Sequence, residues 1–579
     1  MDKDFGFLKN LNEKQKEICI SSDNYLLTAC PGSGKTRTIT YRLAYLYTKY
    51  FPSRKLNIAI TYTNRAANEI YTRLENMGIE TSGIWTGTIH QFCMRFIIRP
   101  YAMYSDSLKS GYRVVDEYVK NQYCSEIASD LGICVWYNDP LSYPPIASEY
   151  VRRLRANKEI DFDMILDLSY KLLDNFPFVA ENISSILRSI HIDEFQDTNK
   201  LQYAILAKIV NRNKAINVVF VGDVNQAIYG SLGGIAKSIN SLETQFGIKL
   251  KSDSLTGCYR STQRIVNYYS NFEVTTTRVQ SVSSNRDIHG TIAYNYTIDK
   301  NILPQKIADI INFHLSSGLP PHEICVVAPR WEQIYPMANS LRKYLPSVSF
   351  DAPDIIPFKY DPMNPFYLLA QLLFTDAGTS TKSRKRIASE LLEILQNEYH
   401  LLLSDRYDIY SLLKAVNSVP KKTEDGLSYY KQSIEYLFGH LNVSLEKECS
   451  LQQSFTLFLD KAQQRINKFH LANTIKDFRA CFKERQGIVI NTIHGIKGEE
   501  YDTVIGFDLL NGHLPHWNYI YDFKKSPFRK IETSKLLYVL CSRAKINLYL
   551  FSETGRATKK GEPLQPTDEL YSVKFDYDE

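Results

Sequence analysis

Short apolar runs alternate with longer segments of helical periodicity along this chain. The runs lie at residues 25–29, 58–63, 190–195, 218–222, 324–328, 488–491, 503–507 and 548–551. Several of them are apolar on both faces, which is typical of strands in a parallel sheet that helices cover on both sides. The pattern therefore predicts an α/β protein in which parallel strands alternate with helices.

Two long stretches interrupt this alternation. Residues 100–185 and 353–485 read mainly as helix, with breaks near prolines and little strand signal. We therefore predict two α/β lobes, each interrupted by a mostly helical inserted subdomain. The predicted first lobe comprises residues 1–96 and 186–254 with the insert 97–185, and the second comprises residues 255–352 and 486–579 with the insert 353–485.

Composition and charge exclude several classes of protein. The 579 residues carry a formal net charge of +6, which permits a polyanionic partner without requiring one. No run reaches the roughly 18–20 apolar residues of a membrane span, and the polar segment 1–10 does not resemble a signal peptide. The ten cysteines form no C-x-x-C pair, which argues against a zinc or iron–sulfur site. We therefore expect a reduced, cytoplasmic protein with no membrane contact.

A glycine-rich loop follows the first predicted strand and opens a helix, which is the context of a Walker A phosphate-binding loop. Its residues are Ala29, Cys30, Pro31, Gly32, Ser33, Gly34, Lys35 and Thr36, and Ala29 stands where the general pattern has glycine. Gly32 and Gly34 let backbone amides turn towards phosphate oxygens, and the helix N-terminus adds positive charge. We expect Lys35 to neutralise the β- and γ-phosphates and Thr36 to bind Mg²⁺.

Acidic and amide side chains end two further predicted strands. Asp193 is expected to hold Mg²⁺ through water, and Glu194 to polarise the attacking water as a general base. Gln226 follows the run 218–222 and is a candidate sensor of the γ-phosphate. The alternatives are an acidic strand end that faces solvent and an ordinary loop glutamine. The Walker A loop favours the catalytic interpretation of the two acids.

Together with several downstream motifs, these elements resemble the superfamily 1 DNA helicases of the UvrD/Rep type over nearly the whole chain. The matching segments are 11–15, 61–67, 86–92, 193–198, 255–261, 492–501 and 537–545. They correspond in order to the family's Q motif, T-F-T-N-K-A-A, G-T-x-H, D-E-F-Q-D-T, N-Y-R-S, T-x-H-x-x-K-G-x-E-[FWY] and Y-V-x-x-T-R-A-K. The resemblance implies two RecA-like P-loop lobes that use ATP and Mg²⁺ and bind single-stranded DNA or single/double-strand junctions.

The resemblance also implies contacts to the base and sugar of ATP. Gln15 would read the adenine edge, and Arg37 would flank the base. Tyr259 would stack on adenine, since stacking accepts any purine face. Glu500 would hold the ribose, and Gly498 would allow close approach.

Two arginines from the second lobe complete the implied ATP site. Arg260 and Arg543 would reach the γ-phosphate as arginine fingers and neutralise the charge that builds in the transition state. A permanently charged, delocalised guanidinium suits that task better than an ammonium group. The alternative for each arginine, taken singly, is a surface ion pair.

Candidate DNA contacts fall into two groups. The base-stacking candidates are the aromatic residues Tyr62, Phe92 and Tyr229, and the phosphate or sugar candidates are Asn64, Thr88 and His90. The alternative for Phe92 is a position in the core. Basic clusters at 152–158 and 382–386 on the two inserts are candidates for holding duplex phosphates, with a solvated charged face as the alternative.

The chain departs from the family pattern at a few positions. After G-D the family usually continues Q-x-I-Y-x-[FW]-R-G-A, but Ser231 and Leu232 stand in place of the second aromatic and the arginine. Cys258 replaces the usual asparagine before Tyr259. We expect ATP chemistry to persist, whereas the loss of a base wedge and a charge contact weakens unwinding.

The function implied by the resemblance is an ATP-dependent DNA helicase or translocase that moves 3′ to 5′ on single-stranded DNA, in DNA repair or anti-phage defence. One alternative is a DNA-stimulated or nucleotide-sensing ATPase that activates a partner nuclease with little unwinding. Another is a structural relative that binds DNA without hydrolysis. The run 96–100 and the short second insert are similar to the helicase-like subunit of Gabija-type anti-phage systems, which implies a separate nuclease partner.

Overall fold

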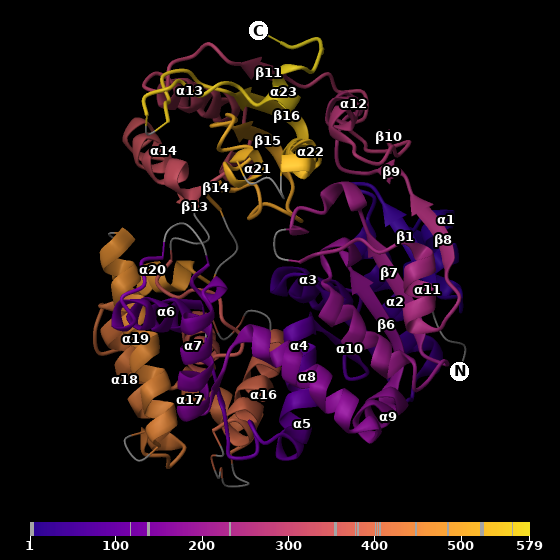
Figure 1. Cartoon of the computed structure of the whole chain (residues 1–579), viewed down its shortest axis with the longest axis vertical. Helices are drawn as coiled ribbons and strands as arrows, with labels where there is room; N and C mark the ends of the chain where they lie inside the picture. The colour runs from indigo at the N-terminus through magenta and orange to yellow at the C-terminus, as the bar shows by residue number, and fades with distance from the viewer. Residues whose placement is uncertain are drawn as a thin grey trace. The chain divides into compact units, whose positions relative to one another are not determined.

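Two six-stranded parallel sheets, flanked by helices, organise the chain (Figure 1). The computed structural model describes all residues except 1–4, 116, 136–138, 231–232, 352–355, 377, 379–380, 400, 402, 404–406, 446–447, 470, 483–485, 522–525, 559 and 579. The predicted α/β class with parallel sheets is confirmed. Ser231 and Leu232, the departures from the family pattern, lie outside the described residues.

The first sheet has the strand order β3-β2-β6-β7-β1-β8. Its strands are β1 (Tyr25–Ala29), β2 (Leu56–Thr61), β3 (Ile84–Thr88), β6 (Leu187–Asp193), β7 (Asn217–Gly222) and β8 (Lys251–Leu255). Every neighbouring pair is parallel, with Leu27 opposite Val221, for example. We call this sheet and its helices the first lobe.

The second sheet has the order β11-β16-β15-β12-β14-β13, again with every neighbouring pair parallel. Its strands are β11 (Ile292–Asn295), β12 (Ile324–Ala328), β13 (Phe350–Asp351), β14 (Ile488–Thr492), β15 (Tyr501–Gly506) and β16 (Ala544–Phe551). Two short strands, β9 (Gly257–Cys258) and β10 (Gln280–Ser281), form a separate pair. We call the second sheet and its helices the second lobe.

Apolar faces of helices cover both sheets. The first lobe carries α1 (Glu13–Ile20), α2 (Lys35–Tyr50), α3 (Asn64–Asn76), α9 (Pro177–Ile186), α10 (Lys200–Val210) and α11 (Ile239–Phe246). The second lobe carries α12 (Gln263–Tyr269), α13 (Leu303–Ser316), α14 (Trp331–Tyr344), α21 (Asn518–Tyr521), α22 (Arg529–Cys541) and α23 (Asp568–Tyr571). In the first lobe Ile39, Leu43 and Ile70 pack against Leu27 and Val219 of the central strands. Burial of these apolar surfaces supplies the main stabilising free energy of the lobe.

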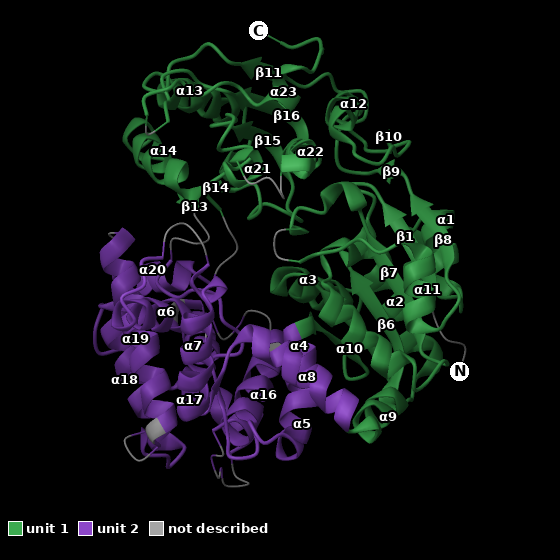
Figure 2. Ribbon diagram, viewed as in Figure 1, with its two compact units in different colours: residues 1–89, 176–352, 485–579 green, residues 90–175, 353–484 purple. Residues whose placement is uncertain are grey.

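Both lobes belong to one compact unit, comprising residues 1–89, 176–352 and 485–579, whereas residues 90–175 and 353–484 form a second unit (Figure 2). The two helical stretches therefore pack together, although the sequence pattern suggested one insert for each lobe. In this second unit Arg99 forms ion pairs with Glu390 (3.2 Å) and Glu398 (2.7 Å), which joins its two chain segments.

The second unit is almost entirely helical. Its main helices are α6 (Glu117–Asp130), α7 (Pro144–Ala156), α8 (Phe162–Asn175), α15 (Pro365–Phe374), α16 (Thr381–Asn397), α17 (Ile409–Asn417), α18 (Gly426–His440), α19 (Cys449–Phe469) and α20 (Ile475–Ala480). Shorter elements are α4 (Ile89–Cys93), which begins at the boundary, α5 (Arg99–Tyr101), β4 (Arg113–Val114) and β5 (Glu159–Ile160). Aromatic side chains, among them Phe358, Phe366 and Tyr430, fill its core.

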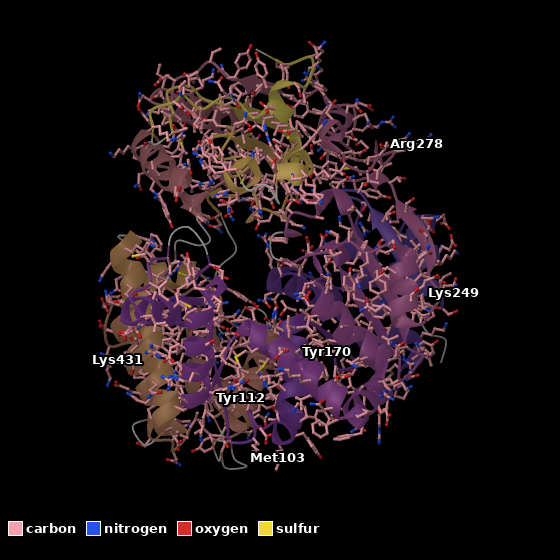
Figure 3. The ribbon with its side chains drawn as sticks, viewed as in Figure 1. Met103, Tyr112, Tyr170, Lys249, Arg278 and Lys431 are labelled. Carbon is pink, nitrogen blue, oxygen red and sulfur yellow. The ribbon has the colours of Figure 1, made fainter. Side chains whose placement is uncertain are left out.

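Lys249 and Arg278 on the first unit and Lys431 on the second are exposed charged residues, whereas Met103 on the second unit is an exposed apolar residue (Figure 3). Among the described residues, no helix combines the length and the apolar character that crossing a membrane requires.

Candidate nucleotide and nucleic-acid site

The glycine-rich loop joins the end of β1 to the start of α2, as the sequence predicts. Gly32 and Gly34 have φ angles of 70° and 81°, in the left-handed region where a side chain would be strained. A Cβ atom built on Gly32 would lie 2.6 Å from Cβ of Arg260, so a residue of the second lobe approaches the loop closely. The backbone amide of Tyr259 also donates to the carbonyl of Gly32 (2.8 Å).

Side chains inside the first lobe hold this loop in shape. The Ser33 hydroxyl donates to the carbonyl of Cys30 (2.8 Å), and the Gln15 amide nitrogen donates to the carbonyl of Ser33 (3.1 Å). Gln15 also forms a capping box with Asn12 at the start of α1. Gln15 thus supports the loop directly, and its predicted contact with adenine remains a prediction.

The two predicted acids lie beside the loop. The Thr36 hydroxyl donates to Asp193 Oδ2 at 3.3 Å, so two oxygen atoms of the type that Mg²⁺ prefers are adjacent. Among the described residues no group of three or more His, Cys, Asp or Glu side chains could hold a metal on its own. This arrangement fits Mg²⁺, which usually keeps water and phosphate oxygens among its ligands.

Burial and charge shape the acidic pair. Burial, followed by the neighbouring Glu194 carboxylate, raises the pKa of Asp193 to about 7. Burial alone would also raise the pKa of Glu194, but the cations Lys35, Lys497 and Arg543 bring it below its usual value. Glu194 has a φ of 53°, a backbone conformation that costs free energy outside glycine and is often found at functional sites. Glu194 is therefore held as a carboxylate within reach of cations from both lobes.

Gln226 connects the two lobes. Its amide nitrogen donates to Asp223 Oδ2 (2.7 Å), and its amide oxygen accepts from Arg543 Nη2 (3.0 Å). Arg543 is fully buried and also donates to the carbonyl of Glu499 (3.2 Å). Burial, followed by the charge of Arg260, lowers the pKa of Arg543 to about 9. The buried guanidinium is thus fixed at the border between the lobes, next to the predicted γ-phosphate sensor.

Arg260 lies in the same region. Its Nε donates to Glu500 Oε2 (2.8 Å), and its Nη1 donates to the carbonyl of Ser542 (2.8 Å). The structure therefore brings the predicted ribose residue together with one predicted arginine finger. Gly498 has a φ of 84° and open space around its missing side chain, which suits the close approach that the motif implies.

The predicted base contacts lie at the rim of the loop. Tyr259 is 45% exposed, and its hydroxyl accepts from the Asn12 amide (2.5 Å). Arg37 donates to the carbonyl of Asn10 (2.6 Å), and its guanidinium lies 5.4 Å from the centre of the Tyr41 ring. An exposed aromatic ring and a guanidinium group at this rim can accept a planar base between polar neighbours.

Two predicted stacking residues contact each other. The rings of Tyr62, just after β2, and Tyr229 stack at 4.4 Å with an interplanar angle of 25°. The Tyr229 hydroxyl donates to the carbonyl of His494 (3.3 Å), and the Lys497 ammonium lies 4.9 Å from the Tyr229 ring centre. The sequence predicted two separate platforms, whereas the structure forms one aromatic pair with a cation against it.

The polar DNA candidates occupy the ends of neighbouring elements. Asn64 is the first residue of α3, and Thr88 is the last residue of β3. The Asn64 side-chain oxygen is buried without a hydrogen-bond partner among the described residues, a position that normally demands an explanation. His90 belongs to the second unit, where burial lowers its pKa and its ring packs edge-on against Phe162.

One predicted DNA contact, Phe92, and one residue of a candidate basic cluster, Arg384, are buried in the structure. Phe92 has 0% exposed surface and its ring lies 5.1 Å from that of Phe96, so it is a core residue and cannot stack on a base. Arg384, in the basic cluster of the second insert, is 4% exposed and donates to the carbonyl of Leu372 (2.7 Å). The sequence left these alternatives open because a short run of residues does not show which face of a helix is buried.

The sequence analysis assigned no role to two ion pairs that cross the border between the lobes. Lys497 pairs with Asp197 and also donates to the carbonyl of Gln226 (2.6 Å). Arg65 pairs with Glu499. Arg65 stands where the family motif also has a cation, lysine, and nothing in the local sequence indicates Glu499 as its partner.

Comparisons of the sequence with known protein families match it to helicase domains. Residues 11–133 and 142–247 match the UvrD/REP helicase N-terminal domain, and residues 446–554 match the UvrD-like helicase C-terminal domain. The chain is 30% identical over 293 residues to "ATP-dependent DNA helicase PcrA" of Staphylococcus epidermidis RP62A, and 29% identical over the same length to the protein of that name from Staphylococcus aureus Mu50. Each alignment covers 45% of this chain and 40% of the relative.

Proposed function

Because the chain belongs to the UvrD/Rep family of helicases, we propose that it is an ATP-dependent motor that moves 3′ to 5′ along single-stranded DNA and unwinds duplex DNA. The observation that carries this proposal is the hydrogen bond between Arg543 of the second lobe and Gln226 of the first (3.0 Å). A group at this border can report the state of a bound nucleotide from one lobe to the other.

The residues of the first lobe are suited to bind ATP and prepare the attacking water. The loop amides and Lys35 would hold the phosphates, and Glu194 would orient and deprotonate the water. Thr36 and Asp193 would hold Mg²⁺, which when bound supplies positive charge to the phosphate oxygens. Gln226 would orient the reacting groups through its contact with Asp223.

The residues of the second lobe are suited to stabilise the transition state. Arg543 and Arg260 would neutralise the charge that develops on the transferred phosphoryl group. Tyr259 would stack on the base while Glu500 holds the ribose. Because these groups belong to the other lobe, binding of ATP would draw the lobes together and hydrolysis would release them. The stacked rings of Tyr62 and Tyr229 would then shift along DNA bases with each cycle.

The biological process in which the motor acts is part of the same proposal. We propose that the motor acts in DNA repair or anti-phage defence. A second candidate, an ATPase that activates a separate nuclease with little unwinding, is supported by the replacement of the family's aromatic and arginine by Ser231 and Leu232. Single-stranded DNA or single/double-strand junctions are the proposed substrates in both cases.

The test measures ATP hydrolysis with and without single-stranded DNA, and strand displacement on duplexes with a 3′ or a 5′ tail. The motor predicts DNA-stimulated hydrolysis and displacement only from the 3′-tailed duplex. Stimulated hydrolysis without displacement would favour the second candidate. An unstimulated ATPase, or no hydrolysis at all, would contradict both.

A further inference from the structure

Arg65 and Glu499 form an ion pair between the two lobes. Arg65 is the second residue of α3, whose first turn carries the DNA candidate Asn64. Glu499 precedes the predicted ribose residue Glu500 in the loop before β15. The pair therefore connects a segment that is a candidate for DNA contact to a segment at the candidate ATP site.

The two partners have very different surroundings. The Arg65 side chain is 62% exposed, whereas the Glu499 side chain is 6% exposed. The Glu499 carboxylate also accepts a hydrogen bond from the Tyr501 hydroxyl, and its backbone carbonyl accepts from Arg543 Nη1 (3.2 Å). A buried carboxylate depends on its cation, but an exposed guanidinium can exchange one anion for another.

The start of α3 offers a second anion a place to bind. Thr63 caps the helix by accepting from the backbone amide of Ala66 (3.2 Å), and the helix N-terminus adds partial positive charge. An arginine at such a position matches the geometry of a phosphate group, which it can hold with two parallel hydrogen bonds.

We propose that Arg65 alternates between Glu499 and a backbone phosphate of single-stranded DNA. This inference rests on the proposed function and adds the residue by which DNA reaches the ATP site. When a phosphate takes Arg65, Glu499 loses this ion pair, and the loop whose carbonyl accepts from Arg543 keeps the contacts of Lys497 with the first lobe but is held there less firmly. The coupling is reciprocal, because a change at that loop must alter DNA affinity by the same factor.

The first test measures the affinity of the full chain for oligo-dT at several salt concentrations, using E499L, R65Q and the double variant R65Q/E499L. E499L is expected to bind DNA about fivefold more tightly, because the carboxylate no longer competes for Arg65. R65Q is expected to bind more weakly and to reduce the salt slope by about one. In the R65Q background, E499L is expected to leave DNA affinity unchanged, because the exchange requires the Arg65 guanidinium.

A charge-matched control separates this exchange from bulk electrostatics. D253N also removes one negative charge from the first unit. Asp253 pairs with Lys14 (2.7 Å) and not with Arg65, so D253N is expected to leave DNA affinity unchanged. If E499L strengthens binding equally with and without Arg65, or if D253N has the same effect, the exchange is refuted. Thermal unfolding of each variant verifies that the comparison is made between folded proteins.

The second test measures ATP hydrolysis. In E499L the turnover without DNA is expected to rise towards the DNA-stimulated value, so that the stimulation ratio falls at least about twofold. An unchanged ratio in E499L, beside a wild type that DNA stimulates, would overturn the inference and leave the proposed function intact. A wild type that DNA does not stimulate would overturn both.

Discussion

The two lobes have similar parallel sheets but present opposite edges to the candidate ATP site. In the first lobe the predicted site residues follow the carboxyl ends of strands, as the glycine-rich loop follows β1 and Gln226 follows β7. In the second lobe Glu500 and Arg543 directly precede the amino ends of β15 and β16. The first edge is the one at which parallel α/β sheets usually bind ligands.

This difference separates two chemical tasks. The first lobe offers backbone amides, hydroxyls and carboxylates, which suit phosphate and Mg²⁺. The second lobe contributes guanidinium groups, which suit the added charge of a transition state. Changes at the phosphate-binding residues of the first lobe are therefore expected to remove both ATP binding and ATP hydrolysis. Changes at the arginines of the second lobe are expected to slow hydrolysis and spare ATP binding.

The largest effect is expected from K35A in the first lobe. Without the ammonium group the phosphate charge is unpaired, so ATP binding weakens and hydrolysis falls to background with or without DNA. Hydrolysis assays and binding of a fluorescent ATP analogue measure the two losses. DNA-stimulated turnover retained by K35A would refute the assignment of the loop.

R543A in the second lobe is expected to reduce ATP hydrolysis strongly, but to affect ATP binding less than K35A does. Loss of an arginine finger typically costs about 10³–10⁵ in kcat, while the first lobe continues to hold ATP. We therefore expect kcat to fall by about 10³ and the affinity for the ATP analogue to change by less than about threefold. If binding and turnover fall together, the proposed division between the lobes is wrong.

Y62A tests the aromatic pair. Stacking contributes about 1–3 kcal/mol per base, so the affinity for single-stranded DNA is expected to fall by about 5- to 150-fold. ATP binding is expected to stay near normal. Y571A removes a tyrosine that is 56% exposed and packs edge-on against Tyr296, and it serves as the matched control. Equal losses of DNA and ATP binding in Y62A would mean that Tyr62 is a core residue.

An effect on stability, with no expected change in activity at neutral pH, distinguishes the two sheets. Burial, followed by the charge of Arg42, lowers the pKa of His191 in β6 to about 3, whereas the strands of the second sheet contain no histidine. Folding therefore favours the neutral imidazole of His191. The contribution of this preference to the free energy of unfolding is fully present above pH 6.5 and is lost as the pH falls towards 3.

The measurement is thermal or urea unfolding between pH 7 and pH 4. His191 is expected to contribute a slope of at most about 1.4 kcal/mol per unit of pH to the wild type, and H191L is expected to lose it. Since H191L also removes the contact between Nδ1 and the Ile58 carbonyl (3.1 Å), only the slope and not the absolute stability decides. The same slope in H191L would contradict the assignment.

The sequence predicted the strands that carry the site because they are central and apolar. The strands β1 and β12 have the bounds that their apolar runs predict. The edge strands β3 and β8 have no such runs, since β3 contains Thr-Gly-Thr and β8 contains Lys, Ser and Asp. Their pairing depends on the neighbouring strand, which a local pattern does not contain.

The loop residues of the candidate site were predictable, but their contacts were not. The motif identifies Gly32, Lys35 and Thr36 through local strand, loop and helix signals. The contact between Arg543 and Gln226 joins residues 317 positions apart, and that between Arg65 and Glu499 joins residues 434 positions apart. Such pairs depend on how the lobes meet, which no spacing in the sequence records.

The central claim is that the two lobes form one site around a single nucleotide, and a double-mutant cycle on Gln226 and Arg543 tests it most directly. Single-turnover hydrolysis is measured for Q226A, R543A and the double variant. If the two side chains act together, the double variant is expected to be no slower than R543A beyond about threefold. If the rate of the double variant instead falls by the product of the two single-variant factors, Gln226 and Arg543 act independently, which would contradict the account.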